Sequence, residues 1–149
     1  FGLNKIQLPQ KLFGVFEHKV MNRKIPLVRG FDDFFLIPHS RHTTVDAEQI
    51  HGCRELTVLA ESEQAGVLLC MTEGGKQIFV MGHPEYDRYT LHNEYIRDKE
   101  KGLPISVPKN YYPNDDETKK PSLQWRSHSN NLYCNWLNYY VYQITPYEL

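Results

Sequence analysis

Apolar residues alternate with polar ones or form short continuous runs through the first half of the chain. Residues 12–20 show the alternation of a half-buried strand, and residues 34–37 form an apolar run that Pro38 is expected to end. Three further runs are separated by turns that contain glycine: residues 56–60, 67–71 and 77–81. We therefore predict that these last three strands pair as adjacent hairpins.

The spacing of apolar residues changes to that of helices at three places. Residues 46–51, followed by Gly52, predict a short helix with a glycine stop, and residues 87–101 carry a longer helical pattern. An aromatic, amphipathic stretch predicts a final helix over about residues 130–142. Between the last two helices, residues 104–121 are rich in proline, asparagine and aspartate and predict a long surface loop.

Composition limits the class of protein. The chain has 149 residues, of which 40% are hydrophobic and 23% charged, so it can build the core of a single domain. Its net charge of -1 provides no basic surface for nucleic acid or for an anionic membrane, and no apolar run approaches the roughly 20 residues that span a bilayer. Its three cysteines lack C-x-x-C spacing and favour a reducing cytoplasm: Cys53, Cys70 and Cys134.

His83 and Glu85 form the most informative motif, because they lie two residues apart just after the strand expected at residues 77–81. A histidine held by a carboxylate can take and return a proton near neutral pH, as a general base must. The two side chains are therefore expected within hydrogen-bonding reach of each other. The alternative is a loop that caps the following helix, in which Glu85 stabilises the positive helix end. The spacing alone leaves both interpretations open.

No cysteine in the chain is a good candidate for the nucleophile that would complete a triad. Cys70 lies within an apolar strand and is expected to be an inert core residue. Cys53 and Cys134 lack the glycine-rich turn that exposes a nucleophile. The residues therefore offer half of a triad.

A second polar group follows the strand expected at residues 34–37. His39 and His42 could bind a metal, but no third ligand stands at a recognised spacing, so a polar loop is favoured. Ser40 and Arg41 together suit a carboxylate ligand, because guanidinium can bind it bidentately and a hydroxyl can add a hydrogen bond. A strand end with surface charges explains the same residues equally well.

Six segments of the chain, taken in order, resemble the signatures of one protein family. They are residues 11–18, 29–33, 38–41, 82–87, 125–128 and 135–143. They resemble bacterial homoserine O-succinyltransferases, also called homoserine transsuccinylases, whose close relatives are homoserine O-acetyltransferases. The resemblance extends over the whole chain, and so many ordered segments are more specific than any single motif.

The resemblance implies an α/β fold of the class I glutamine-amidotransferase type, which is flavodoxin-like, with residues 1–149 as the carboxy-terminal half of a single domain. It implies that His83 is the general base and that Glu85 is its acidic partner. The nucleophilic cysteine of the family lies in the amino-terminal half, before the position that matches Phe1. Three substrate-binding residues are also implied: Lys11, Ser40 and Arg97.

The same resemblance implies a reaction. The family transfers an acyl group from acyl-CoA to the hydroxyl of L-homoserine through a cysteine thioester, in methionine biosynthesis. The overall match favours succinyl-CoA over acetyl-CoA as donor; acyl-CoA is a co-substrate, and no cofactor or metal is implied. The implied partners are the amino-terminal segment of the same protein and a second copy in a homodimer. The alternatives are a non-catalytic fragment that keeps its substrate-binding and dimerisation surfaces, and a glutamine-amidotransferase-like hydrolase.

Overall fold

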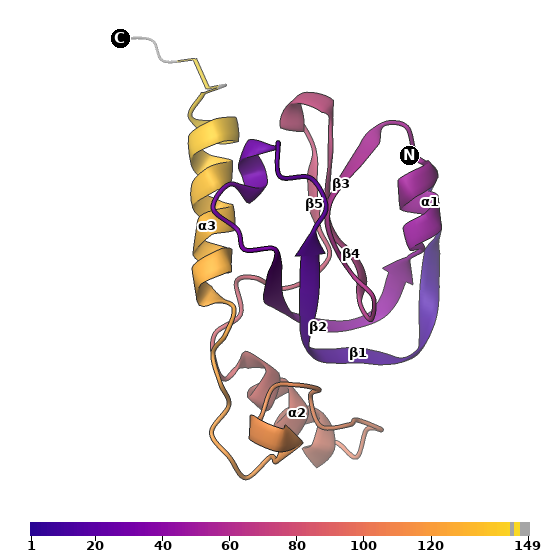
Figure 1. Cartoon of the computed structure of the whole chain (residues 1–149). Helices are drawn as coiled ribbons and strands as arrows, with labels where there is room; N and C mark the ends of the chain where they lie inside the picture. The colour runs from indigo at the N-terminus through magenta and orange to yellow at the C-terminus, as the bar shows by residue number, and fades with distance from the viewer. Residues whose placement is uncertain (144, 147–149) are drawn as a thin grey trace.

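A five-stranded antiparallel sheet with the strand order β2-β1-β3-β4-β5 forms the centre of the computed structural model, which describes residues 1–143 and 145–146 (Figure 1). Its strands are β1 (Lys5–Val20), β2 (Phe34–Val45), β3 (Leu56–Ser62), β4 (Gly66–Thr72) and β5 (Ile78–Val80). The last three strands pair in chain order. The predicted adjacent hairpins are therefore confirmed.

Helices lie on both sides of this sheet and beyond one end of it. In the described part of the chain the α-helices are α1 (Ala47–Gly52), α2 (Thr90–Glu100) and α3 (Arg126–Trp136), and the 3-10 turns are η1 (Pro26–Val28), η2 (Glu73–Gly75) and η3 (Pro113–Asp115). Figure 1 shows α1 and α3 flanking the sheet and α2 below it. All three predicted helices are present, although the last begins at Arg126 and continues into a π-helical turn, η4 (Leu137–Val141). Over residues 1–143 and 145–146, no helix has the length and apolar character needed to cross a membrane.

The main core lies between the sheet and the segment formed by η1 and α3. Leu27 of η1 is fully buried, and Phe35 of β2 belongs to the same apolar cluster. A smaller cluster beneath α1 contains Ile50 and Val67. Val67 and its neighbour Leu68 belong to different clusters, because adjacent strand residues point to opposite faces of a sheet. The sheet therefore carries apolar packing on both faces.

β2 runs through Pro38, so the prediction that this proline ends the strand is wrong. β2 lies at the edge of the sheet, where a residue without an N–H group can be accommodated. The Pro38 carbonyl accepts a hydrogen bond from the His83 N–H at 2.8 Å. Residues 39–42 therefore belong to a strand, and the expectation of a polar loop at this position is also wrong.

β1 begins at Lys5, well before the alternation that starts at residue 12. Its first part pairs with the end of β2, and the register shifts between Gln7 and Leu12. Pro9 lies in this irregular part and interrupts the short alternation of residues 5–8, so the pattern did not predict a strand here.

Residues 104–121, all of which the structure describes, contain no strand or α-helix, as predicted, and they lie against β1. The Lys109 N–H donates to the Phe13 carbonyl at 3.0 Å, and the Val15 N–H donates to the Lys109 carbonyl at 2.8 Å. Gly14 has a φ of 144°, and a Cβ at this position would collide with the Lys109 carbonyl. Glycine thus lets the loop backbone approach β1 closely.

Candidate active site

The turn after β5 lies directly on the sheet and carries His83. The His83 N–H is held by the Pro38 carbonyl, as described above. Gly82 precedes it, and a Cβ on this glycine would lie 2.8 Å from Ile37 Cγ2 and 2.9 Å from Leu68 Cδ1. A larger residue at position 82 would therefore force these buried side chains to shift, and glycine permits the close approach that holds the backbone of His83 on the sheet.

The side chains of His83 and Glu85 are hydrogen-bonded, as expected from their spacing. His83 Nδ1 lies 2.8 Å from Glu85 Oε1, and the two side chains are 35% and 53% exposed. Because a carboxylate accepts hydrogen bonds, the neutral imidazole donates through Nδ1–H and keeps its lone pair on Nε2. Nε2 is therefore free to accept a proton from a bound molecule, although a catalytic role for the pair stays a prediction.

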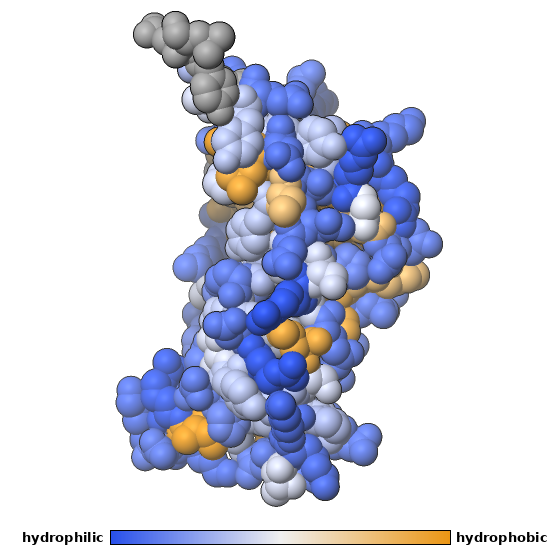
Figure 2. Space-filling model, turned by 90° about the vertical axis from the view of Figure 1, so that its left-hand side faces the viewer, coloured by the Kyte–Doolittle hydropathy of each residue, from blue (hydrophilic) through white to orange (hydrophobic). Residues whose placement is uncertain are grey.

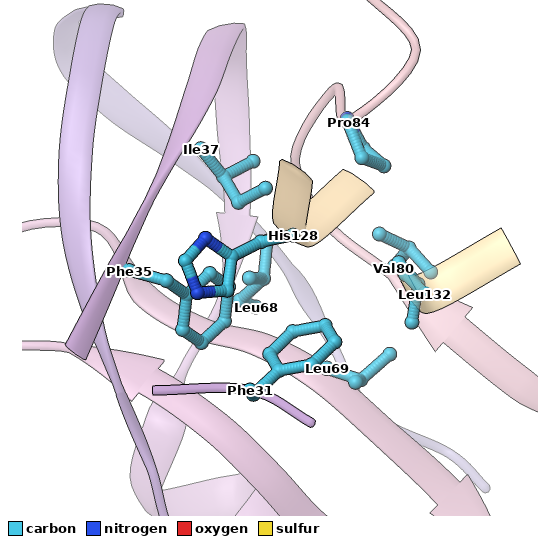
Figure 3. A pocket seen from close by; sticks show the side chains of 9 residues that line it. All are labelled: Phe31, Phe35, Ile37, Leu68, Leu69, Val80, Pro84, His128 and Leu132. Atoms are coloured by element: carbon cyan, nitrogen blue, oxygen red, sulfur yellow. The ribbon is translucent and has the colours of Figure 1, made fainter. Parts of the chain in front are cut away.

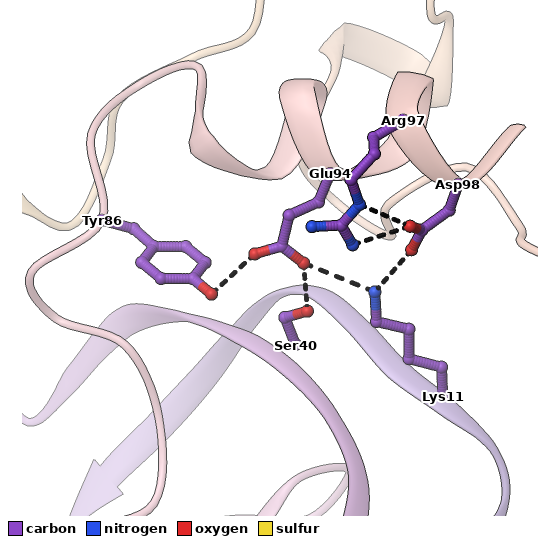
Figure 4. A network of polar contacts seen from close by, with 6 residues as sticks. All are labelled: Lys11, Ser40, Tyr86, Glu94, Arg97 and Asp98. Atoms are coloured by element: carbon purple, nitrogen blue, oxygen red, sulfur yellow. Dashed lines mark hydrogen bonds and ion pairs between the residues drawn. The ribbon is translucent and has the colours of Figure 1, made fainter. Parts of the chain in front are cut away.

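Lys11, Ser40 and Arg97, the three residues expected to contact substrate, meet in one network with two carboxylates. Figure 4 shows this polar cluster, which we define as Lys11, Ser40, Tyr86, Glu94, Arg97 and Asp98. Lys11 Nζ lies 3.4 Å from Glu94 Oε2 and 3.3 Å from Asp98 Oδ2. Arg97 contacts Asp98 Oδ1 at 2.7 Å. β1, β2 and α2 thus each contribute to the cluster.

Glu94 is the centre of the polar cluster. One of its oxygens accepts hydrogen bonds from the Ser40 hydroxyl and from Lys11, and the other accepts from the Tyr86 hydroxyl at 2.7 Å. Burial acts to raise the pKa of Glu94, but the hydrogen bonds from Ser40 and Tyr86 and the charge of Lys11 outweigh it and lower that pKa. The hydrogen bond from Arg97 is the main reason why the pKa of Asp98 is lowered. Both carboxylates are therefore ionised at neutral pH.

The polar cluster presents donors and acceptors at the same place. Lys11 and Arg97 can bind a carboxylate, and Arg97 can do so with two parallel hydrogen bonds. The Ser40 hydroxyl donates its one proton to Glu94 and can accept a hydrogen bond from a ligand. Glu94 and Asp98 can accept hydrogen bonds from an ammonium group. A free amino acid carries both groups, so the arrangement suits a small zwitterion.

Tyr86 joins the His83–Glu85 pair to this cluster. Its ring stacks on the ring of His83 with centroids 4.3 Å apart and planes inclined by 14°. Because its hydroxyl bonds to Glu94, the His83–Glu85 pair and the polar cluster belong to one continuous set of contacts.

Arg41 does not share the site with Ser40, so a joint carboxylate site at these two residues is wrong. The Arg41 guanidinium donates to Thr44 Oγ1 at 2.9 Å and to the Ala65 carbonyl. Adjacent residues of a strand point to opposite faces, which separates Arg41 from its neighbour Ser40 in β2.

His39 is buried in β2 and pairs with His18 of β1. Their Nε2 atoms are 3.1 Å apart, and both side chains have no exposed surface. Burial lowers the pKa of His18 to about 4 and that of His39 to about 2, so both rings are neutral at pH 7. Among the residues that the structure describes, no three metal-ligating side chains come together. His39 is thus part of the core.

Tyr86, Glu94 and Asp98 are site residues that the sequence did not identify as such. Glu94 and Asp98 recur at helical spacing and therefore lie on one face of α2, which was a usable signal. Their contacts with residues of β1 and β2 depend on where α2 packs against the sheet. The spacing of residues along the helix does not predict that position.

The three cysteines lie outside the polar cluster. Cys70 is fully buried in β4, and burial is the main cause that raises the pKa of its thiol to about 11. Cys53 is half-buried and Cys134 is exposed. Among the described residues, His83 forms no hydrogen bond with any of them. The expectation that Cys70 is a core residue is confirmed.

Two cavities adjoin the turn that carries His83. The first, of about 10 Å³, is a packing gap that is too small for any ligand larger than one water (Figure 3). Its lining residues are Phe31, Phe35, Ile37, Leu68, Leu69, Val80, Pro84, His128 and Leu132. The second is a hollow of about 350 Å³ between residues 84–87 and the start of α3, which Glu85 borders. Its volume falls in the range of small-molecule sites.

Comparison with solved structures places the fold. The chain is similar to a glutamine amidotransferase from Methylobacillus flagellatus, with a TM-score of 0.60 and 10% identity over 91% of this chain and 55% of that one. It is also similar to a glutamine amidotransferase from Thermotoga maritima, with a TM-score of 0.52 and 17% identity over 67% of this chain and 40% of that one. The predicted α/β fold of the glutamine-amidotransferase type is therefore confirmed.

Comparison of sequences places the family. A family model described as homoserine O-succinyltransferase matches residues 1–147. A homoserine O-acetyltransferase from Lachnoclostridium phytofermentans is 66% identical over 149 residues, which are 100% of this chain and 50% of that protein. Another from Agathobacter rectalis is 68% identical over 148 residues, 99% of this chain and 48% of that protein. The chain spans about half the length of these curated relatives, and it belongs to the homoserine O-succinyltransferase family.

Proposed function

We propose that this chain supplies the general base and the homoserine-binding groups of a homoserine O-acyltransferase. The observation that carries the proposal is the contact between two sets of residues: the His83–Glu85 pair and the polar cluster centred on Glu94. The first set can move a proton, and the second can hold an amino acid.

Homoserine fits the cluster group by group. Arg97 is 54% exposed, so its guanidinium can bind the α-carboxylate while it remains in contact with Asp98. Lys11 adds a positive charge and Ser40 adds a hydroxyl, and both groups lie beside the same oxygen of Glu94. Glu94 is the acceptor for the α-ammonium group, because it is ionised and a carboxylate has about four acceptor sites, of which three are already used by Lys11, Ser40 and Tyr86. The substrate hydroxyl is left to face His83.

The transfer takes place in two steps. A cysteine thiolate first attacks the acyl-CoA thioester, so that CoA leaves and an acyl-cysteine forms. The homoserine hydroxyl then attacks the acyl carbon while His83 Nε2 takes its proton; the new C–O bond forms as the C–S bond breaks, and the proton passes to the released thiolate. Glu85 holds the ring orientation through Nδ1 and stabilises the imidazolium.

We assign the nucleophilic cysteine to the amino-terminal half of the family's proteins, which this chain does not cover. The burial of Cys70 and the position of all three cysteines outside the polar cluster support this assignment. The amino-terminal half, a second copy in a homodimer, L-homoserine and acyl-CoA are then the partners of the chain. The cytoplasmic location expected from the cysteines stays a prediction.

We propose acetyl-CoA as the acyl donor. The relatives from both organisms above are named acetyltransferases, whereas succinyl-CoA, which the family resemblance favours, is supported by the description of the family model. Supplying the protein purified from its source with both donors, and identifying the O-acylhomoserine by mass spectrometry, tests this choice.

A hybrid enzyme tests the reaction. In this hybrid, the chain replaces the 148 matching residues of the Agathobacter rectalis relative, whose own amino-terminal half is kept. With acetyl-CoA and L-homoserine, the hybrid should form O-acetylhomoserine, and the unmodified relative serves as the positive control. A folded hybrid without product contradicts the proposal, as does an acyl group trapped on Cys53, Cys70 or Cys134. Release of glutamate from glutamine would favour the hydrolase instead.

A further inference from the structure

Tyr86 is fixed at three points, two of which lie on functional groups. Its ring stacks on His83, and its hydroxyl donates to Glu94, as described above. Its carbonyl accepts a hydrogen bond from Trp125 Nε1 at 2.8 Å, and Trp125 is buried with an exposed fraction of 1%. Core packing thus anchors the residue that links the two parts of the site.

His83 needs a second constraint besides its hydrogen bond to Glu85. Glu85 is 53% exposed, and an exposed ion pair or hydrogen bond of this kind is weak because water competes for both partners. A single bond at Nδ1 also leaves the imidazole free to rotate about that contact. The ring of Tyr86, parallel to the imidazole within 14°, restricts this rotation.

We propose that Tyr86 is a positioning residue that holds the His83 imidazole in place through its ring and holds Glu94 through its hydroxyl. The inference rests on the proposed acyl transfer, and it assigns the two functions to two separable parts of one side chain. Burial and the hydrogen bond to Glu94 raise the pKa of Tyr86, so its hydroxyl remains a donor at neutral and moderately alkaline pH.

Two substitutions in the hybrid enzyme separate these functions. Tyr86→Phe keeps the ring and removes the hydroxyl, so kcat should stay within about twofold while KM for homoserine rises roughly tenfold, as for one lost hydrogen bond to a charged group. Tyr86→Leu removes the ring as well, so kcat should fall roughly a hundredfold, the usual effect of a misplaced catalytic group. Tyr89→Leu is the control, because Tyr89 is 46% exposed and lies outside the polar cluster.

An NMR measurement tests the stack without any turnover. A ring stacked at 4.3 Å shifts the His83 ring protons upfield through its ring current. The upfield shift should persist in Tyr86→Phe and disappear in Tyr86→Leu, and thermal unfolding of each variant checks that the hybrid remains folded.

Each outcome decides the proposal. Equal losses of kcat in both variants would assign the effect to the hydroxyl and overturn the role of the ring. Unchanged His83 signals in Tyr86→Leu would overturn it as well. A hybrid that is inactive before any substitution contradicts the proposed function, whereas the ring-current shifts still decide whether Tyr86 holds His83.

Discussion

Single residues set the charge balance of the polar cluster, and Glu94 has the central position in it. It contacts Lys11, Ser40 and Tyr86, and its side chain is 16% exposed. The substrate-binding roles of Lys11, Ser40 and Arg97 are implied by the family resemblance and not by the residue types, and they stay a prediction. The acceptors that complete the site, and the separation of Ser40 from Arg41, follow from strand direction and helix packing, which are properties of the folded chain.

Glu94→Gln should weaken homoserine binding. The amide keeps the size of the side chain but loses the charge that binds the ammonium group, so kcat/KM for homoserine should fall about tenfold to a hundredfold, the value of a charge-assisted hydrogen bond. Steady-state kinetics of the hybrid measures the fall. Glu100→Gln is the matched control, because Glu100 is an exposed residue of the same helix. Equal kinetics for the two variants would remove Glu94 from the site.

At the scale of elements, α2 and the turn after β5 contribute most of the site residues, while β1 and β2 contribute Lys11 and Ser40 and are joined by a buried histidine pair. The pattern of apolar residues predicted the cores of β1 and β2, the three hairpin strands and all three α-helices. It did not predict the passage of β2 through Pro38, because an edge position is a property of the sheet and not of the proline. It also did not predict the first half of β1, whose pairing depends on β2.

The histidine pair predicts acid sensitivity. The pKa values of His18 and His39 in the folded state lie below the ordinary value of 6.5, so the unfolded state binds more protons as the pH falls below 6.5. The free energy of unfolding is therefore unaffected by these rings above pH 6.5 and decreases as the pH falls below that value. The decrease caused by His18 ends near its folded pKa of about 4. At pH 5 each ring should cost about 2 kcal/mol of unfolding free energy.

Urea unfolding of the hybrid at pH 7 and pH 5 measures this loss. His39→Gln cannot titrate and keeps an amide that can bond to His18, so the variant should lose about half as much stability between the two pH values. His42→Gln, an exposed residue of the same strand, is the control and should behave as the unsubstituted hybrid. An unchanged pH dependence in His39→Gln would contradict a buried neutral pair.

At the scale of the whole molecule, apolar side chains interrupt a largely polar surface. Figure 2 shows a few apolar side chains near the carboxy-terminal end of α3. At that end of the chain, Trp136 and Leu137 are exposed, with exposed fractions of 42% and 36%. Phe1 and Phe34, both more than half exposed, lie elsewhere on the surface. We propose that the amino-terminal half of the protein, which the chain lacks relative to its homologues, covers part of this surface.

The 149-residue chain alone should therefore associate. Sedimentation should show self-association, and the amino-terminal half of the Agathobacter rectalis relative, added separately, should convert the chain to a defined complex. A monomeric chain with a cooperative thermal transition and no affinity for that half would show that the chain is self-sufficient.

In the proposed reaction His83 takes the proton of homoserine, and a matched pair of substitutions tests this role most directly. His51 and Glu61 form a similar surface pair, with Nε2 and Oε2 2.6 Å apart, away from the polar cluster. In the hybrid, His83→Ala should lower kcat for O-acetylhomoserine formation by a factor of at least about a hundred, the contribution of a general base. His51→Ala should leave kcat unchanged. Equal activity of the two variants would contradict the account.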